Sequence, residues 1–114
     1  MSSITTYDAS VTATTELLAK GCVLINSVEV ENPNTSVVYL QLFDAALTTD
    51  VTLGSTAPTT TRLIPAGDGT NNGVRILDFT DPLRFEVGVV YAITTTRSGS
   101  TAPSSVCQIN FSRS

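Results

Sequence analysis

Carboxylates are the side chains in this sequence whose types and spacing could support catalysis. Asp78, Asp81 and Glu86 lie close together, and Asp44 and Asp50 flank a long polar loop. Two facing carboxyl groups can serve as the acid and base of a glycosidase. However, Asp81 precedes a proline in a predicted turn, and Asp78 and Glu86 fall on solvent-facing positions of predicted strands. Ten acidic residues among 114 produce such neighbours by chance, so we expect no enzyme and no catalytic residue.

The absence of histidine removes most other reactive arrangements. Ser–His–Asp and Cys–His nucleophiles need an imidazole base, and two cysteines do not complete a structural zinc site. The segment 68–73 (DGTNNG) offers oxygen atoms of the kind that calcium binds. It lacks the acidic count and the bidentate glutamate of an EF-hand loop, and Asp-Gly and Asn-Gly are favoured turn dipeptides. We therefore expect a turn there, with no metal and no other cofactor.

The charge pattern argues against nucleic acid and favours protein partners. Charged residues make up 14% of the chain, against about 25% in ordinary globular proteins, and threonine and serine replace them. The six basic residues are scattered along the sequence, whereas nucleic-acid binding needs a basic stripe that neutralises several phosphates. A neutral, threonine-rich surface suits a protein that meets other protein surfaces, so we expect assembly.

No apolar run approaches the length of a membrane span, so we expect no membrane partner. Residues 1–7 lack the basic and apolar regions of a signal peptide, which favours synthesis in a cytoplasm. In a reducing compartment Cys22 and Cys107 are expected to be free, buried thiols, with a disulfide as the alternative.

The elements that carry these residues read as strands. Runs rich in β-branched, aromatic and aliphatic residues, bounded by Gly, Pro, Asn and Asp, are typical of a buried sheet. The clearest cover residues 22–31, 37–44, 74–79, 86–95 and 106–111, with shorter ones at 11–19, 51–53, 62–64 and 83–85. Residues 14–21 could instead form one helical turn ending at Gly21. The turn at 32–34 predicts a hairpin between 22–31 and 37–44, and Asp81-Pro82 predicts a second turn.

About eight strands at this spacing predict an all-β, antiparallel β-sandwich, jelly-roll-like, with an extended N-terminal segment. The expected organisation is a flexible arm over residues 1–8 and a single sandwich domain over 9–114. Ile4, Tyr7 and Val11 are the apolar residues that could anchor this segment to a partner or to another copy, and a frayed terminus is the alternative.

Four segments in order resemble a known group. They are Val38 to Asp44 (VYLQLFD), Gly54 to Pro58 (GSTAP), Ile64 to Gly67 (IPAG) and Phe85 to Thr94 (FEVGVVYAIT). Together they resemble the small β-sandwich virion proteins of tailed bacteriophages, over about residues 28–111. The resemblance implies a capsid decoration (cement) protein, which binds the major capsid protein across capsomer seams on the outside of the virion after assembly in the host cytoplasm.

Closed symmetry would multiply weak contacts in such a role, so a homo-oligomer, with a trimer favoured, is expected. The alternative is a phage tail, fibre or lectin-like receptor-binding module. Sugar sites favour exposed aromatic rings; tryptophan is absent, Tyr39 and Tyr91 lie in predicted core strands, and only Tyr7 is expected to be free.

Overall fold

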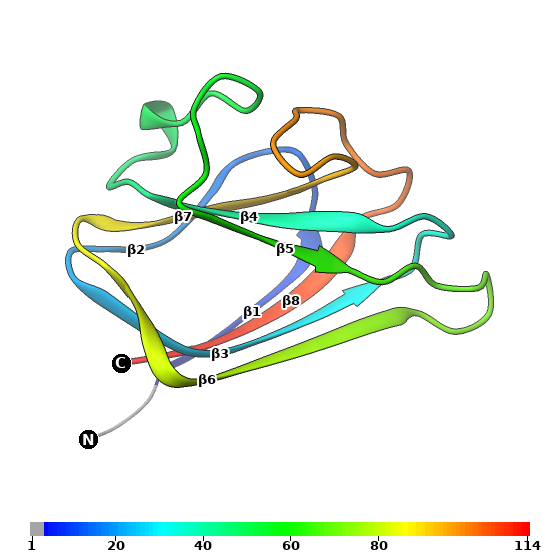
Figure 1. The fold of residues 1–114 in the computed structure, drawn as a ribbon, viewed down its shortest axis with the longest axis horizontal. Helices are drawn as coiled ribbons and strands as arrows, with labels where there is room; N and C mark the ends of the chain where they lie inside the picture. Colours follow the sequence, from blue (N-terminus) through cyan, green and yellow to red (C-terminus); the bar gives the residue numbers. More distant parts are fainter. Residues whose placement is uncertain (1–3) are drawn as a thin grey trace.

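The computed structural model describes residues 4–114 and is all-β, as predicted (Figure 1). Two antiparallel four-stranded sheets form the molecule. Sheet A has the strand order β1 (Ile4–Val11), β8 (Cys107–Arg113), β3 (Val23–Asn32), β6 (Gly73–Phe85). Sheet B has the order β2 (Glu16–Lys20), β7 (Gly88–Thr94), β4 (Val38–Asp44), β5 (Thr60–Ile64). A single turn of 3-10 helix, η1 (Thr48–Asp50), is the only helical element among the described residues, and none of them form a helix long and apolar enough to cross a membrane.

The two sheets face each other across one hydrophobic core. Side chains from both inner faces are almost completely buried, among them Ile25, Leu40, Phe85, Ile93 and Phe111. The rings of Tyr91 in sheet B and Phe111 in sheet A lie 4.9 Å apart, within the range of favourable aromatic pairs. Burying large side chains of this kind contributes about 1.5–3 kcal/mol each. The strands that read as apolar in the sequence therefore hold the two layers together.

A β-bulge in β3 changes which residues face the core. The pairing of β3 with both neighbours shifts between Ile25 and Ser27. Strict alternation had predicted Val23 and Ile25 on the opposite face from Val28 and Val30, and this is wrong. All four side chains are buried in the same core, because the extra residue of a bulge reverses the alternation beyond it.

The predicted hairpin between residues 22–31 and 37–44 is also wrong. β3 belongs to sheet A and β4 to sheet B, so the asparagine turn between them crosses from one sheet to the other. The predicted turn at Asp81-Pro82 is likewise absent, since β6 runs without a break through it. Opposite the β3 bulge, Asp78 pairs with Ser27 and Leu83 with Ile25. Residues 79–82 of β6 therefore lie opposite the single residue Asn26 of β3.

The beginning of the chain differs from the predicted flexible arm. Residues 1–3 of that arm lie outside the described residues, but Ile4 to Asp8 are part of β1 and pair with β8. Pairing with β1 satisfies the backbone N–H and C=O groups along the edge of β8, which explains why Ile4 to Asp8 form a strand. Glu16–Lys20 is a strand and not a helical turn, but the single strand predicted over 11–19 is wrong, because Val11 ends β1 in sheet A and Glu16 begins β2 in sheet B. The short strand predicted at 51–53 is absent, and η1 lies just before it.

Candidate interaction surface

The outer face of sheet B is covered by the chain itself. Phe43 and Val90 on this face pack with Ala45 and Val51 from the loop after β4, and all four are buried. Gln41 is completely buried, and its amide nitrogen donates to the hydroxyl of Thr94 and to the carbonyl of Gly99 in the loop after β7. Two loops thus close this side of the molecule (Figure 1), and none of these β4 and β7 side chains is left for a partner.

Within residues 4–114, the outer face of sheet A has no such cover. Cross-strand partners in an antiparallel sheet point to the same side, and one row across this sheet reads Tyr7, Asn110, Glu29, Ile76. At its two ends Tyr7 is 55% exposed and Ile76 is 60% exposed. Val74, two residues before Ile76 on the same side of β6, is exposed as well. Val74 and Ile76 therefore expose apolar surface at the β6 edge of this face and Tyr7 at its β1 edge, with Asn110 and Glu29 between them.

Polar and acidic side chains lie between these apolar residues. Glu29 and Glu31 alternate with buried Val28, Val30 and Asn32, and therefore project outward from β3. Asp78, paired with Ser27, projects outward from β6 beside them. A shallow groove of about 490 Å³ runs over the face, lined by Thr5, Glu29, Ile76, Asp78, Asn110 and Ser112 among others. No salt bridge within residues 4–114 engages these three carboxylates, so their charge is available to a partner.

The three predicted anchor residues separate in the structure. Tyr7 lies on the bare face, and its role as an anchor stays a prediction. Ile4 is 46% exposed and pairs with Arg113 at the end of the sheet. Val11 is completely buried in the core and cannot contact a partner, because the bulge between Asp8 and Val11 turns its side chain inward. Sequence reasoning missed Ile76, although its alternation with Leu77 in a strand was a usable signal.

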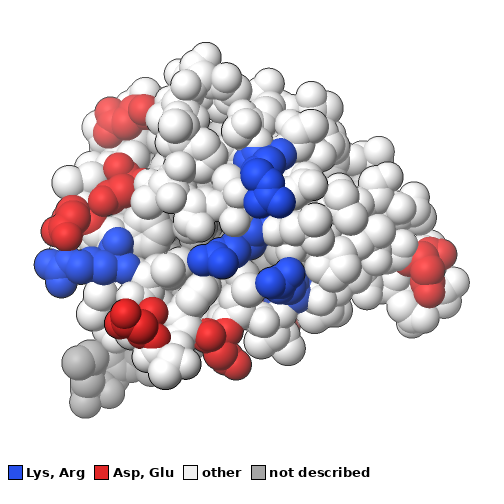
Figure 2. All heavy atoms as spheres, in the orientation of Figure 1, with Lys and Arg blue, Asp and Glu red and all other residues white. Residues whose placement is uncertain are grey.

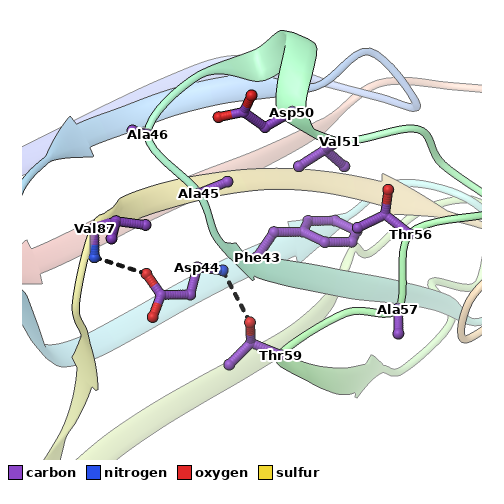
Figure 3. A pocket seen from close by; sticks show the side chains of 10 residues that line it. All are labelled: Phe43, Asp44, Ala45, Ala46, Asp50, Val51, Thr56, Ala57, Thr59 and Val87. Atoms are coloured by element: carbon purple, nitrogen blue, oxygen red, sulfur yellow. Dashed lines mark hydrogen bonds between the residues drawn. The ribbon is translucent and has the colours of Figure 1, made fainter.

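A second hollow, of about 400 Å³, lies between the loop after β4 and the β6–β7 turn (Figure 3). Asp44 and Asp50 both line it, so the predicted pair of acids flanking a loop does meet one cavity. Asp44 Oδ2 and Oδ1, however, accept hydrogen bonds of 3.0 and 2.9 Å from the backbone N–H of Glu86 and Val87. Partial burial raises the pKa of Asp44, but these bonds and one from Gly88 outweigh it and hold the pKa below its usual value. Asp44 is therefore an ionised carboxylate that fixes a turn, which is a structural task.

The loop at 68–73 has a structural explanation too. Asp68 Oδ1 accepts hydrogen bonds from the backbone N–H of Asn71 at 2.6 Å and of Thr70 at 2.9 Å. The same bonds, that from Asn71 first, lower the pKa of Asp68. Within the described part of the chain, no three metal-ligating side chains come together. The loop thus uses its carboxylate to hold its own backbone, as Asx turns do.

The cysteines are free, as predicted, but only Cys107 is buried, and Cys22 is exposed just before β3. The thiol of Cys107 lies 3.8 Å from the amide nitrogen of Asn34. This contact belongs to a buried asparagine cluster at the β3–β4 crossing and not to a reactive site.

Three basic residues that are far apart in the sequence come together around β5. Arg97 donates to the Thr61 hydroxyl at 3.1 Å, Arg75 donates to the Leu63 carbonyl at 3.3 Å, and Arg62 is part of β5 itself. Figure 2, in the orientation of Figure 1, shows most of the Lys and Arg atoms gathered in the middle of this side, with others beside Asp and Glu atoms at its left rim. The scattered positions in the sequence gave no sign of this cluster.

No family model, no curated protein and no solved structure matches this chain.

Proposed function

We propose that this chain is a structural virion protein, a capsid decoration subunit that binds across capsomer seams and stabilises the phage head. The observation that carries the proposal is the asymmetry between the two sheets. One outer face is sealed by the chain's own loops, while the other exposes Tyr7, Val74 and Ile76 around a shallow groove. A broad, bare and only gently hollowed sheet face suits contact with another protein surface better than capture of a small substrate.

The strand pairing supports a jelly roll within this proposal. β1 pairs with β8, β2 with β7, β3 with β6 and β4 with β5, so the chain has the pairing of one long hairpin folded over into two sheets. Eight-stranded double-sheet jelly rolls occur in viral capsid proteins and in lectins. Fold alone does not set function, and the virion assignment leans on the resemblance described above as well as on the bare face.

The direct test is binding to undecorated heads of the tailed phage that encodes the chain. The purified protein is mixed with heads, and its loss from solution is followed by light scattering and co-sedimentation. We expect the wild-type protein to leave solution with the heads and to raise the temperature at which they open. A wild-type protein that stays in solution at every head concentration would overturn the proposal.

The face is tested by Tyr7→Ser and Ile76→Ser, which remove exposed apolar surface without touching the core. Leu47→Ser is the matched control, because Leu47 is 44% exposed and lies in the loop beyond sheet B. Substitutions on the face should reduce occupancy of the heads, and the control should not.

The alternative, a receptor-binding module for glycans, is favoured by one feature of the same face. Tyr7 stands exposed in the row that continues through Asn110 and Glu29. An aromatic ring beside amide and carboxylate groups is the kind of platform on which sugars stack and form hydrogen bonds. Binding to a glycan array that is lost in Tyr7→Ser, together with no binding to heads, would favour this function.

A further inference from the structure

We propose that the partner of the bare face is a second copy of this chain, which presents the arginines around its β5 strand, so that copies join head to tail. The inference rests on the proposed function in one respect, namely that the bare face is a docking face. Because another copy occupies that face in the assembly, the face substitutions would lower head occupancy by breaking the oligomer, and surfaces that stay free would contact the capsid. The two contacting surfaces are the acidic face (Glu29, Glu31 and Asp78 with Tyr7 and Ile76) and the basic seam (Arg62, Arg75 and Arg97).

The basic seam lies where the two sheets meet at their open edge. β5 is the last strand of sheet B and β6 the last strand of sheet A. The guanidinium of Arg62 in β5 lies 5.6 Å from the ring centre of Phe79 in β6, and Arg75 in β6 reaches back to the Leu63 carbonyl in β5. On the other side of β5, the guanidinium of Arg97 lies 4.9 Å over the ring of Tyr39. Contacts of this kind hold the three arginines in defined places.

The seam carries half of the six basic residues of a chain with net charge −4, yet none of the three arginines forms a salt bridge within residues 4–114. The one salt bridge in that range joins Arg84 to Glu86 elsewhere. Nε of Arg62 is buried without a hydrogen-bond partner. Charged side chains on edge strands do protect against strand pairing, which accounts for a charge on each edge. Protection does not require three cations to be gathered without a counter-charge, and their mutual repulsion makes an anionic partner favourable.

The acidic face supplies that counter-charge on the same molecule. Its three carboxylates are also without salt bridges in the described part of the chain, and apolar side chains flank both surfaces: Tyr7 and Ile76 on the face, Tyr39 and Phe79 at the seam. Guanidinium groups pair with carboxylates in two-bond geometry, and complementary charge sets the orientation of association. A surface of each kind on every copy allows each copy to bind one neighbour at the face and another at the seam.

The geometry makes this contact heterologous. The face covers the outside of sheet A, whereas the seam lies at the edge shared by β5 and β6, so the two surfaces point in different directions. Such contacts close into a ring when the rotation permits, and otherwise continue as a filament. Ring closure would join several weak contacts into one stable particle.

The test exchanges the charges on each surface separately. The seam variant is Arg75→Glu with Arg97→Glu, and the face variant is Glu29→Lys with Glu31→Lys. Solution mass is measured by sedimentation and light scattering on the full chain without phage heads. We expect the wild-type protein to be an oligomer that dissociates as salt is raised, because the screening length falls from about 10 Å in 0.1 M salt to about 3 Å in 1 M. Each variant alone should be a monomer.

The decisive sample is the equimolar mixture of the two variants. The acidic seam of one variant then meets the basic face of the other, and its unchanged acidic face meets the other's unchanged basic seam. The mixture should therefore form alternating assemblies, as filaments or as rings with an even number of copies, that neither variant forms alone. Lys20→Glu is the control, because it adds negative charge at a position that pairs with Gly88 in sheet B, away from both β5 and the outer face of sheet A. Circular dichroism melting checks that each variant folds.

A monomeric wild-type protein, variants that oligomerise like the wild type, or a folded mixture that stays monomeric would each overturn the inference. These results are separate from the test of function. A head-to-tail oligomer that ignores phage heads would leave this inference standing and remove the capsid proposal, and a monomer that decorates heads would do the reverse.

Discussion

At the scale of single residues, the most constrained side chains are the asparagines that cross from one sheet to the other. Asn34 donates from its amide nitrogen to Asn32 Oδ1 at 2.8 Å and to the Ser105 carbonyl at 2.9 Å, and its Oδ1 accepts from the Ser105 N–H at 2.7 Å. Asn32 in turn donates to the carbonyls of Ser36 and Pro65. These bonds replace the backbone pairing that a hairpin would have provided.

Asn34→Ala should therefore destabilise the fold by about 1–3 kcal/mol, because it removes the hydrogen bonds to the Ser105 carbonyl and N–H, at about 0.5–1.5 kcal/mol each, while Asn32 Oδ1 keeps the backbone N–H of Asn34. The measurement is the free energy of unfolding in urea. Asn72→Ala, at an exposed loop position, is the control and should change that free energy little. Equal effects of the two substitutions would show that the cluster adds nothing to stability.

The buried thiol of Cys107 predicts a loss of stability in alkali. Burial raises the pKa of Cys107 from 9.0 to about 11, against a smaller lowering by the hydrogen bond from Asn34. As the pH rises from about 9 to about 11, the unfolded chain gives up a proton that the folded chain keeps, so the free energy of unfolding falls in this window. Melting temperatures measured across it should decline less steeply in Cys107→Ala than in the wild type. Cys22→Ala, at an exposed thiol, should keep the wild-type slope.

At the scale of elements, one hydrogen bond ties the edge of sheet A to the centre of sheet B. The hydroxyl of Tyr91 in β7 donates to Asp8 Oδ2 in β1 at 2.7 Å. Burial, and then the bond to Asp8, raise the pKa of Tyr91. Its hydroxyl therefore stays protonated, and remains a hydrogen-bond donor to β1, to higher pH than that of a free tyrosine.

Tyr91→Phe should cost about 1.5–3 kcal/mol, the usual contribution of a hydrogen bond to a charged group. Because the bond is the one side-chain tie from β1 to the other sheet among the described hydrogen bonds, hydrogen exchange should rise first in residues 4–11. Tyr39→Phe is a matched control, since no described hydrogen bond involves its hydroxyl and a phenyl ring keeps the contact with Arg97. Exchange that rises equally over the whole chain would contradict a local role for this bond.

Close approach of the backbone at Gly73 makes a further prediction for the β5–β6 connection. A Cβ atom there would lie 2.0 Å from the carbonyl oxygen of Pro65, so Gly73→Ala must displace backbone and should cost about 3 kcal/mol, the upper end for overpacking. Gly21→Ala meets no atom within 4 Å and has only a positive φ to strain it, at about 1 kcal/mol. Unfolding free energies measured in urea separate the two costs, and equal values would rule out the steric explanation.

The same elements show how far the sequence could be read. Composition, the apolar runs and the turn residues predicted an all-β fold and the location of most strands, because these signals are local. The β3–β4 hairpin was wrong, since Asn32 and Asn34 form bonds with residues 65 and 105 that no local pattern reveals. The bulge at Ile25 to Ser27 likewise reversed the predicted faces. On the candidate surface, Tyr7 was named from the sequence, but Ile76 and the three arginines around β5 were not. Their positions depend on the order of the strands in the two sheets, which no local pattern in the sequence reveals.

At the scale of the whole molecule, the two outer faces differ in what they offer a neighbour. Loops seal sheet B, while sheet A and the open β5–β6 edge carry opposite charges, and no salt bridge within residues 4–114 joins them. A free monomer gains nothing from this arrangement, since separated patches of opposite sign favour association. The arrangement therefore favours association of several copies.

This asymmetry predicts which carboxylates become protected when copies assemble. Carbodiimide coupling of an amine, read by mass spectrometry, reports the accessibility of each acid. Asp78 on the bare face and Asp68 in the loop before β6 are both exposed in the single chain, so both should react in the monomeric seam variant, which sets the reference rate for each acid. In the wild-type oligomer Asp78, Glu29 and Glu31 should react several-fold more slowly, because arginines of the next copy cover them, while Asp68 should be unchanged. Protection of Asp68 with continued reaction of Asp78 would move the contact to the loop end of the molecule and away from the bare face.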